Sequence, residues 1–162
     1  MTLFLVETTL NNTENKQQVE VITAEIAKNH QILEVQVAED FSKAYYIIQS
    51  EQAPTLDVEN VTVDLVKEVR LVGKPAEEVN EAVNYLVEWE IPANITMDQY
   101  LTRKKNNSVR YEEVPEVHFS RTYVCEDMTK CLCFYEAPDE AAVKRAREAV
   151  QTPITSLTKL AE

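Results

Sequence analysis

Glycine is nearly absent from this 162-residue sequence, which contains only Gly73. Average usage would give about ten or more glycines. A P-loop or a GxGxxG loop needs several glycines to approach phosphate closely, so the sequence contains neither. Histidine is also scarce, with His30 and His118 alone. This excludes HxxxH motifs and closed metal sites built from several histidines.

Long apolar runs and an excess of positive charge are missing as well. No run of about 18 apolar residues occurs, so we expect no membrane span. The formal net charge is −12, and an acidic surface repels phosphate, so we expect neither nucleic acid nor an anionic membrane as a partner. Residues 1–73 and 74–162 are both acidic, which predicts no hidden basic face. The N-terminal residues lack the basic and apolar regions of a signal peptide, which favours a cytoplasmic protein.

The sequence has three cysteines, Cys125, Cys131 and Cys133. An odd number argues against a disulfide framework. All three lie in strand-like sequence, where cysteine behaves as a small buried hydrophobe. Cys131 and Cys133 point the same way on a strand and could share a soft metal, with core packing as the alternative.

An internal repeat organises the chain. The eight residues Val37–Ala44 recur, identical or closely substituted, as Val124–Cys131. Two shorter matches keep the same order: Leu5–Glu7 with Leu86–Glu88, and Leu65–Lys67 with Leu157–Lys159. We therefore expect a first, degenerate repeat over residues 1–73, a helical linker over 74–84 and a second repeat over 85–162. Gly73 marks the junction.

Each repeat has the periodicity of a strand, a helix, two strands, a variable segment and a final strand. This βαββαβ order is typical of the ferredoxin-like fold. The segment 49–65 is shorter than its equivalent 136–157, so we expect the second helix of the first repeat to be shortened or lost. The predicted fold class is α+β, with tandem ferredoxin-like repeats whose antiparallel sheets pack face to face. In the second repeat, Thr96 and Gln99 resemble a capping box that opens a helix.

A regular hairpin at residues 126–129 predicts which side chains share a face. The core-facing set contains His118, Ser120, Thr122, Val124, Cys131, Cys133 and Tyr135, and the second, mixed set contains Phe119, Arg121, Tyr123, Leu132, Phe134 and Glu136. A bulge would exchange these faces.

Arg121, Tyr123 and Glu136, joined by Glu88, could bind a metal or orient a polar ligand on the mixed face. Alternatively, Arg121 only satisfies a buried glutamate. The basic run Arg103–Lys105 is expected to be a solvated helix face.

The stretches Phe119–Val124 and Cys133–Glu140, with Asp127 between them and Leu86–Glu88 before them, resemble a small bacterial family of unknown function. That family includes nickel-binding ferredoxin-like proteins and belongs to the dimeric α/β-barrel group. The resemblance covers residues 85–160 and implies a barrel formed within one polypeptide. It also implies nickel or another divalent metal, with Glu88, Tyr123, Cys133 and Glu136 as motif positions and His118 nearby. The metal ligands it suggests are His118, Cys133, Glu88 and Glu136.

Three functions follow from these features. The first is a binding protein that holds a divalent metal or small ligand between the two sheets, with no catalytic residues. The second is an enzyme resembling the cofactor-independent monooxygenases or isomerases of the barrel group, with Tyr123, Arg121 and a carboxylate around an aromatic substrate. The third is a structural interaction module without a ligand. The expected partner is a metal ion or small ligand, and a homo-oligomer remains open.

Overall fold

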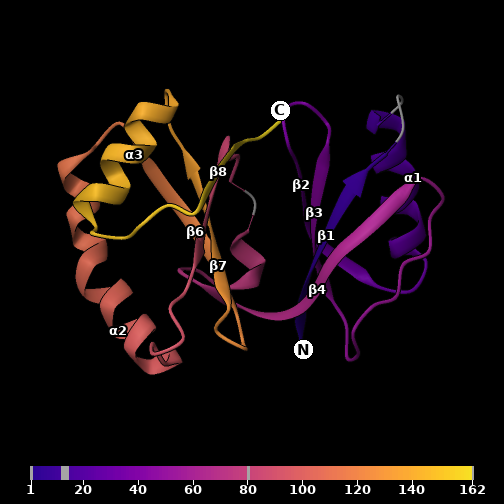
Figure 1. Ribbon diagram of the computed structural model, residues 1–162, viewed down its shortest axis with the longest axis horizontal. Helices are drawn as coiled ribbons and strands as arrows, with labels where there is room; N and C mark the ends of the chain where they lie inside the picture. Colours follow the sequence, from indigo (N-terminus) through magenta and orange to yellow (C-terminus); the bar gives the residue numbers. More distant parts are fainter. Residues whose placement is uncertain (1, 12–14, 80, 162) are drawn as a thin grey trace. The chain divides into compact units, whose positions relative to one another are not determined.

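The computed structural model describes residues 2–11, 15–79 and 81–161. The chain divides into two compact units (Figure 1). The first unit comprises Met1–Val69 with Leu160–Glu162, and the second comprises Arg70–Lys159.

The first unit is an antiparallel sheet with one helix. Its strands occur in the order β2-β3-β1-β4, and residues 50–60, between β3 and β4, contain no helix. Ile22 and Ile26 of the helix are buried in one cluster with Val6 and Tyr46 of the sheet. The elements are β1 (Leu3–Leu10), α1 (Asn15–Ala27), β2 (Gln31–Val37), β3 (Lys43–Gln49) and β4 (Val61–Val72), whose last three residues belong to the second unit.

The second unit has the complete βαββαβ order, with strands arranged β6-β7-β5-β8. Figure 1 shows α2 and α3 on the same side of β6 and β7. The predicted α+β class and ferredoxin-like order are confirmed. The elements are β5 (Tyr85–Glu90), α2 (Met97–Asn107), the 3₁₀ helix η2 (Ser108–Glu113), β6 (His118–Cys125), β7 (Lys130–Glu136), α3 (Glu140–Ala149) and β8 (Ser156–Lys159).

Both helices of the second unit begin at side-chain caps. Thr96 and Gln99 form the expected capping box at the start of α2. Asp139 accepts a hydrogen bond from the backbone N–H of Ala142 at 2.8 Å and so caps α3. Among the described residues, no helix combines the length and apolar character needed to cross a bilayer.

The segment 74–84 differs from the helix that the sequence predicts. Within its described residues, it contains only the single 3₁₀ turn η1 (Ala76–Glu78). Glu77 and Glu81 would lie four residues apart on a helix, where like charges repel. Lys74 instead binds Glu81 across the segment, with 2.6 Å between Nζ and Oε1. This ion pair favours a compact loop.

Each unit contains a bulge in the strand that follows its first helix. The register shifts between Ile32 and Glu34 in the first unit and between Phe119 and Arg121 in the second. These positions are related by the same offset as the repeated motif.

Because of the bulge, the side chains at the N-terminal end of β6 lie on the opposite faces from those predicted. Phe119 joins the face that carries Tyr135, and His118 pairs with Glu136. From Arg121 to Cys125 the predicted alternation holds. The extra residue in the bulge exchanges the faces of the residues that precede it.

Candidate functional site

The candidate site begins with the alternation of strand β7. Cys131, Cys133 and Tyr135 all point toward the helices and are buried in the core beneath them. The neighbouring strand places Trp89 opposite Cys131 and Val87 opposite Cys133. The side of the sheet that packs against α2 and α3 is called the helix face below.

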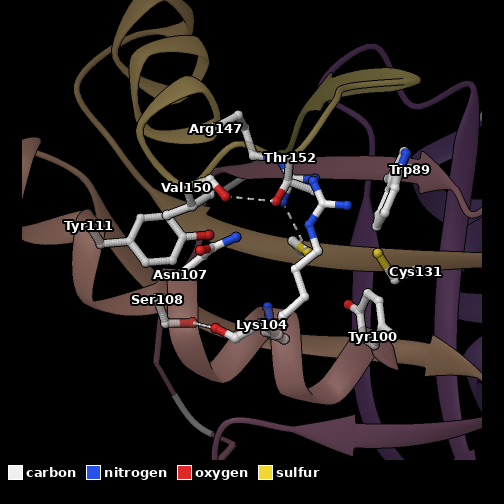
Figure 2. Close-up of a pocket in the computed structure, with 12 residues that line it drawn as sticks. Trp89, Tyr100, Lys104, Asn107, Ser108, Tyr111, Cys131, Arg147, Val150 and Thr152 are labelled. Atoms are coloured by element: carbon white, nitrogen blue, oxygen red, sulfur yellow. Dashed lines mark hydrogen bonds between the residues drawn. The ribbon is translucent and has the colours of Figure 1, made fainter. Parts of the chain in front are cut away.

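Helices α2 and α3 complete a pocket over this face. Figure 2 shows Cys131 between the rings of Trp89 and Tyr100. The cavity volume is about 30 Å³. A cavity needs about 10–15 Å³ to admit one water molecule, so this pocket admits a molecule of only a few atoms. Its lining consists of Trp89, Tyr100, Arg103, Lys104, Asn107, Ser108, Tyr111, Cys131, Cys133, Arg147, Val150 and Thr152.

Arg147, in the last turn of α3, is the central cation of the pocket. Its side chain is only 2% exposed. The guanidinium donates from Nη1 to the hydroxyl of Tyr135 at 3.0 Å and to Sγ of Cys133 at 3.4 Å, and from Nη2 to the carbonyl of Pro153 at 2.9 Å. Its Nε has no hydrogen-bond partner. A buried guanidinium cannot lose its charge, so it requires an opposite charge nearby.

The thiol of Cys133 can supply that charge. The pKa of Cys133 is held well below its usual value, chiefly because Cys131 donates a hydrogen bond to it. Burial opposes this shift, whereas the charges of Lys104 and Arg147 and a hydrogen bond from Thr122 reinforce it. The Thr122 hydroxyl lies 3.3 Å from the sulfur of Cys133. The pocket therefore favours a thiolate at Cys133.

Cys131 has the opposite tendency. The donation of its proton to Cys133, followed by burial, raises the pKa of Cys131 well above its usual value. Burial is also the main reason why the pKa of Tyr100 is raised. Tyr100 hydrogen-bonds to Cys131, and Cys131 hydrogen-bonds to Cys133. The Tyr100 hydroxyl, the Cys131 thiol and the Cys133 sulfur therefore form one hydrogen-bonded chain across the pocket. The two pKa shifts therefore have opposite directions, which favours a thiolate at Cys133 and a thiol at Cys131.

A pair of tyrosines extends this network. The hydroxyls of Tyr111 and Tyr135 lie 2.6 Å apart. Burial raises the pKa of both residues, and the neighbouring Cys133 charge adds to the effect. The Tyr111 ring stacks on Phe119 with 5.2 Å between centroids, because the bulge has brought Phe119 onto the helix face. Both tyrosines are therefore neutral hydrogen-bonding groups.

The charge of the pocket is unlike that of the whole chain. Arg103, Lys104 and Arg147 line it, and none of the described residues of its lining is an aspartate or a glutamate. Arg103 lies over the Trp89 ring at 5.6 Å, and Lys104 lies over the Phe119 ring at 4.3 Å. Arg103 is exposed, as expected for a solvated helix face, although it also lines the pocket. Lys104 departs from the expectation, because it is half-buried and faces the pocket. The chain concentrates positive charge here despite its net charge of −12.

The structure separates the residues that the family resemblance suggested as metal ligands. Cys133 lies on the helix face, whereas Glu88 and Glu136 alternate onto the opposite face of the sheet. Glu88 pairs with Leu132 of β7. Leu132 precedes Glu136 by four residues, so Glu88 and Glu136 are separated by about 13 Å along the strand direction. Glu88 binds Lys130 with 2.7 Å between Oε1 and Nζ. Cys133, Glu88 and Glu136 therefore do not converge on one ion.

His118 lies at the exposed end of β6, opposite Glu136. Its Nε2 is 2.8 Å from Oε2 of Glu81. Glu81 also binds Lys74, and hydrogen bonds from Lys74 and then His118 lower the pKa of Glu81 to about 2. His118, Glu81 and Lys74 thus form a surface cluster, separate from the cysteines.

Arg121 and Tyr123 both lie on the face opposite the helices. The Arg121 guanidinium donates to the hydroxyl of Ser120 at 2.7 Å and to the carbonyl of Glu81 at 3.3 Å. It also lies 5.5 Å from the centroid of the Phe134 ring, against which Tyr123 packs edge-on. Arg121 and Tyr123, both predicted as ligand-binding residues, therefore contact the same aromatic ring, that of Phe134.

The pocket donors do not fit a divalent metal. Nickel could use the two sulfurs of Cys131 and Cys133. However, Arg147 donates to one of these sulfurs, and Lys104 adds a second positive charge that repels a cation. Across the described residues, no three His, Cys, Asp or Glu side chains form a group able to hold a metal ion.

Sequence reasoning missed Arg147, Lys104, Tyr100 and Tyr111. Arg147 gives a detectable signal, because it shares a helical stripe with Ala142, Val143 and Ala146, all of which are buried. An arginine on the apolar face of a helix indicates a buried charge.

The second unit has the element order and sheet topology of a ferredoxin-like α+β fold. Residues 85–160 match the family "Nickel responsive protein SCO4226-like", which confirms the resemblance seen in the sequence. No curated protein sequence matches the chain.

Two solved structures provide a comparison. The crystal structure of putative chlorite dismutase TA0507 is similar to the chain with a TM-score of 0.58 and 11% identity, over 100% of this chain and 96% of that one. This likeness shows the fold. The CRISPR endoribonuclease Cse3 bound to RNA gives a TM-score of 0.32 at 11% identity, over 98% of this chain and 99% of that one.

Proposed function

We propose that this protein binds one small anion per chain in the pocket of the second unit. The observation that carries the proposal is the pocket lining, with three cations and no carboxylate around a cavity of about 30 Å³. Even with Cys133 ionised, the three cations leave an excess of positive charge. Positive charge in a small, partly enclosed cavity attracts an anion more strongly than the same charge does in bulk solvent.

The unpartnered Nε of Arg147 supports the same ligand class. A buried donor without a partner costs about 1–3 kcal/mol, and a bound acceptor would recover part of that cost. Lys104 supplies a second cation beside the cavity. The hydroxyls of Tyr100 and Tyr111 are held neutral by burial and can donate hydrogen bonds. The pocket thus offers charge and hydrogen bonds to a ligand of only a few atoms.

Azide tests this proposal because it is a small anion whose infrared stretch reports its surroundings. We expect saturable binding of one azide per chain by calorimetry, together with a shifted infrared band. Lys104→Gln removes one of the three positive charges and should weaken binding by roughly fivefold or more. Arg145→Gln is the matched control, because Arg145 is an exposed residue of α3 that binds Glu116. An absence of saturation, or equal weakening by both variants, would contradict the proposal.

The family match favours a second candidate, a nickel-related role. His118 and Glu81 offer a nitrogen and a carboxylate 2.8 Å apart at the surface. These donor types suit nickel. A partial surface site of this kind would leave the remaining ligand positions to water.

Calorimetry with nickel chloride on protein that carries no affinity tag tests the second candidate. His118→Ala and Glu81→Ala should both weaken nickel binding, whereas His30→Ala, the matched control, should not. X-ray absorption of the nickel-loaded protein should show nitrogen and oxygen ligands without sulfur. Nickel–sulfur bonds would instead place the ion at Cys131 and Cys133, and would contradict both the surface site and the anion pocket.

A further inference from the structure

We infer that Cys133 is a peroxide-reactive thiolate and that Cys131 is the thiol that resolves its oxidised form. The inference uses the cavity of the proposed function but does not require that an anion bind there. Cys131 and Cys133 both line the cavity, so a small oxidant that enters it meets both sulfurs.

The environment of Cys133 suits a nucleophile. Its sulfur accepts hydrogen bonds from the Arg147 guanidinium at 3.4 Å and from the Thr122 hydroxyl at 3.3 Å. Both donors stabilise the thiolate, which is the reactive form of cysteine. The same two donors hold the sulfur in one orientation at the wall of the cavity.

The size of the cavity selects the oxidant. A volume of about 30 Å³ admits hydrogen peroxide but not a bulky organic hydroperoxide. The rings of Trp89, Tyr100 and Tyr111 close much of the remaining wall. We therefore expect reaction with hydrogen peroxide in preference to larger electrophiles.

The first step forms a bond between the Cys133 sulfur and one peroxide oxygen. The oxygen–oxygen bond breaks, and hydroxide leaves and takes a proton from solvent. The sulfur loses two electrons, the peroxide gains two, and Cys133 becomes a sulfenic acid. Arg147 stabilises the charge that develops on the departing oxygen, because it lines the cavity and has an unpartnered Nε.

The second step uses the neighbouring thiol. Cys131 attacks the sulfenic sulfur, a sulfur–sulfur bond forms, the sulfur–oxygen bond breaks, and water leaves with the Cys131 proton. The two residues point the same way on β7 and are separated by one residue, which places their Cα atoms about 6.6 Å apart. This distance is near the upper end of the disulfide range, so we expect a thiol to reverse the bond readily.

The chain supplies its own control in Cys125. This cysteine is also buried and forms no disulfide in the described part of the chain, but it is not among the residues that line the pocket. Oxidation driven by general thiol reactivity would modify Cys125 along with the others. Oxidation driven by the pocket would spare it.

The experiment treats the full-length protein with hydrogen peroxide at pH 7 and maps the products by peptide mass spectrometry. We expect a Cys131–Cys133 disulfide, formed at least tenfold faster than free cysteine reacts, because a free thiol is only about 3% ionised at this pH. In Cys131→Ser, dimedone added together with denaturant after the peroxide should trap a sulfenic acid at Cys133. Arg147→Gln should slow the reaction, and Arg145→Gln should not.

If a variant fails to fold, the oxidation products of Cys125, Cys131 and Cys133 in the unsubstituted protein still provide the test. Equal oxidation of Cys125, or reaction of Cys133 no faster than free cysteine, would overturn the inference. A protein that binds azide but leaves Cys133 unreactive contradicts only this inference. A protein that reacts at Cys133 but does not bind azide contradicts only the anion proposal.

Discussion

Arg147 donates a hydrogen bond from Nη1 to Sγ of Cys133 at 3.4 Å, which joins the last turn of a helix to the middle of a strand. The guanidinium cannot neutralise itself, so the thiol becomes the group that adjusts its protonation. Lys104 adds a second positive charge that favours the thiolate. This single pair explains why a helix-covered core contains a small, polar and positively charged cavity.

The hydroxyl of Tyr135 should contribute measurably to stability. It accepts from Arg147 at 3.0 Å and lies 2.6 Å from the hydroxyl of Tyr111. Tyr135→Phe would leave two buried polar groups short of a partner, so we expect a loss of about 1–3 kcal/mol in the free energy of unfolding, measured with urea.

Tyr46→Phe is the matched comparison in the first unit. The Tyr46 hydroxyl is buried and has a side-chain hydrogen bond with Thr23, whereas the Tyr135 hydroxyl bonds a charged group. Because hydrogen bonds to charged groups are stronger, the removal of the Tyr46 hydroxyl should cost less than the removal of the Tyr135 hydroxyl. Equal losses in the two variants would show that the Arg147 network contributes nothing specific.

Glu81 should make stability depend on acid pH. Its pKa is about 2 in the folded protein against 4.5 ordinarily, because it accepts hydrogen bonds first from Lys74 and then from His118. A folded-state pKa below the unfolded value gives stability that is present above pH 4.5 and is lost as the pH falls toward 2.

Urea titrations at pH 7, 4.5 and 3 measure this dependence. Glu81→Gln should flatten it, whereas Glu77→Gln, in the neighbouring 3₁₀ turn, should leave the slope in place. An unchanged slope in Glu81→Gln would assign the acid sensitivity to other carboxylates.

Gly73 should be required for its backbone conformation. Its φ is +112°, in a region that residues with a side chain rarely adopt. An added Cβ would meet no atom closer than 3.8 Å, so crowding is not the difficulty. Gly73→Ala should therefore lower the free energy of unfolding by about 1 kcal/mol or more through backbone strain alone. A neutral result in urea unfolding would mean that the loop adopts another conformation.

Much of the fold can be predicted from the sequence, because its signals are local. Asp40 and Asp127 each accept from the backbone N–H two residues later at 3.0 Å, as the repeated motif indicates. Phe41 and Met128, which follow them, share a positive φ. The bulge before Arg121 could not be predicted, because an extra residue in a strand leaves no mark in the hydrophobic alternation.

The pocket could not be assembled from the sequence for a different reason. Its residues come from β5, α2, η2, β7 and α3 and the segment that follows α3, and no short motif joins them. The net charge of each half of the chain also conceals Arg103, Lys104 and Arg147, because charges average in sequence but not in space. Predicting Cys133 as a metal ligand depended on the family motif, which identifies a position but does not reveal which face of the sheet the side chain lies on.

The quenching of Trp89 tests the central claim most directly. Trp89 is the only tryptophan in the chain and lines the pocket beside Arg103. Iodide and caesium quench indole fluorescence, carry opposite charge and can be compared at equal ionic strength. We expect iodide to quench Trp89 more strongly than caesium does, and Lys104→Gln to reduce the difference. A net charge of −12 acting alone would favour caesium, so equal or stronger quenching by caesium would contradict a positively charged pocket.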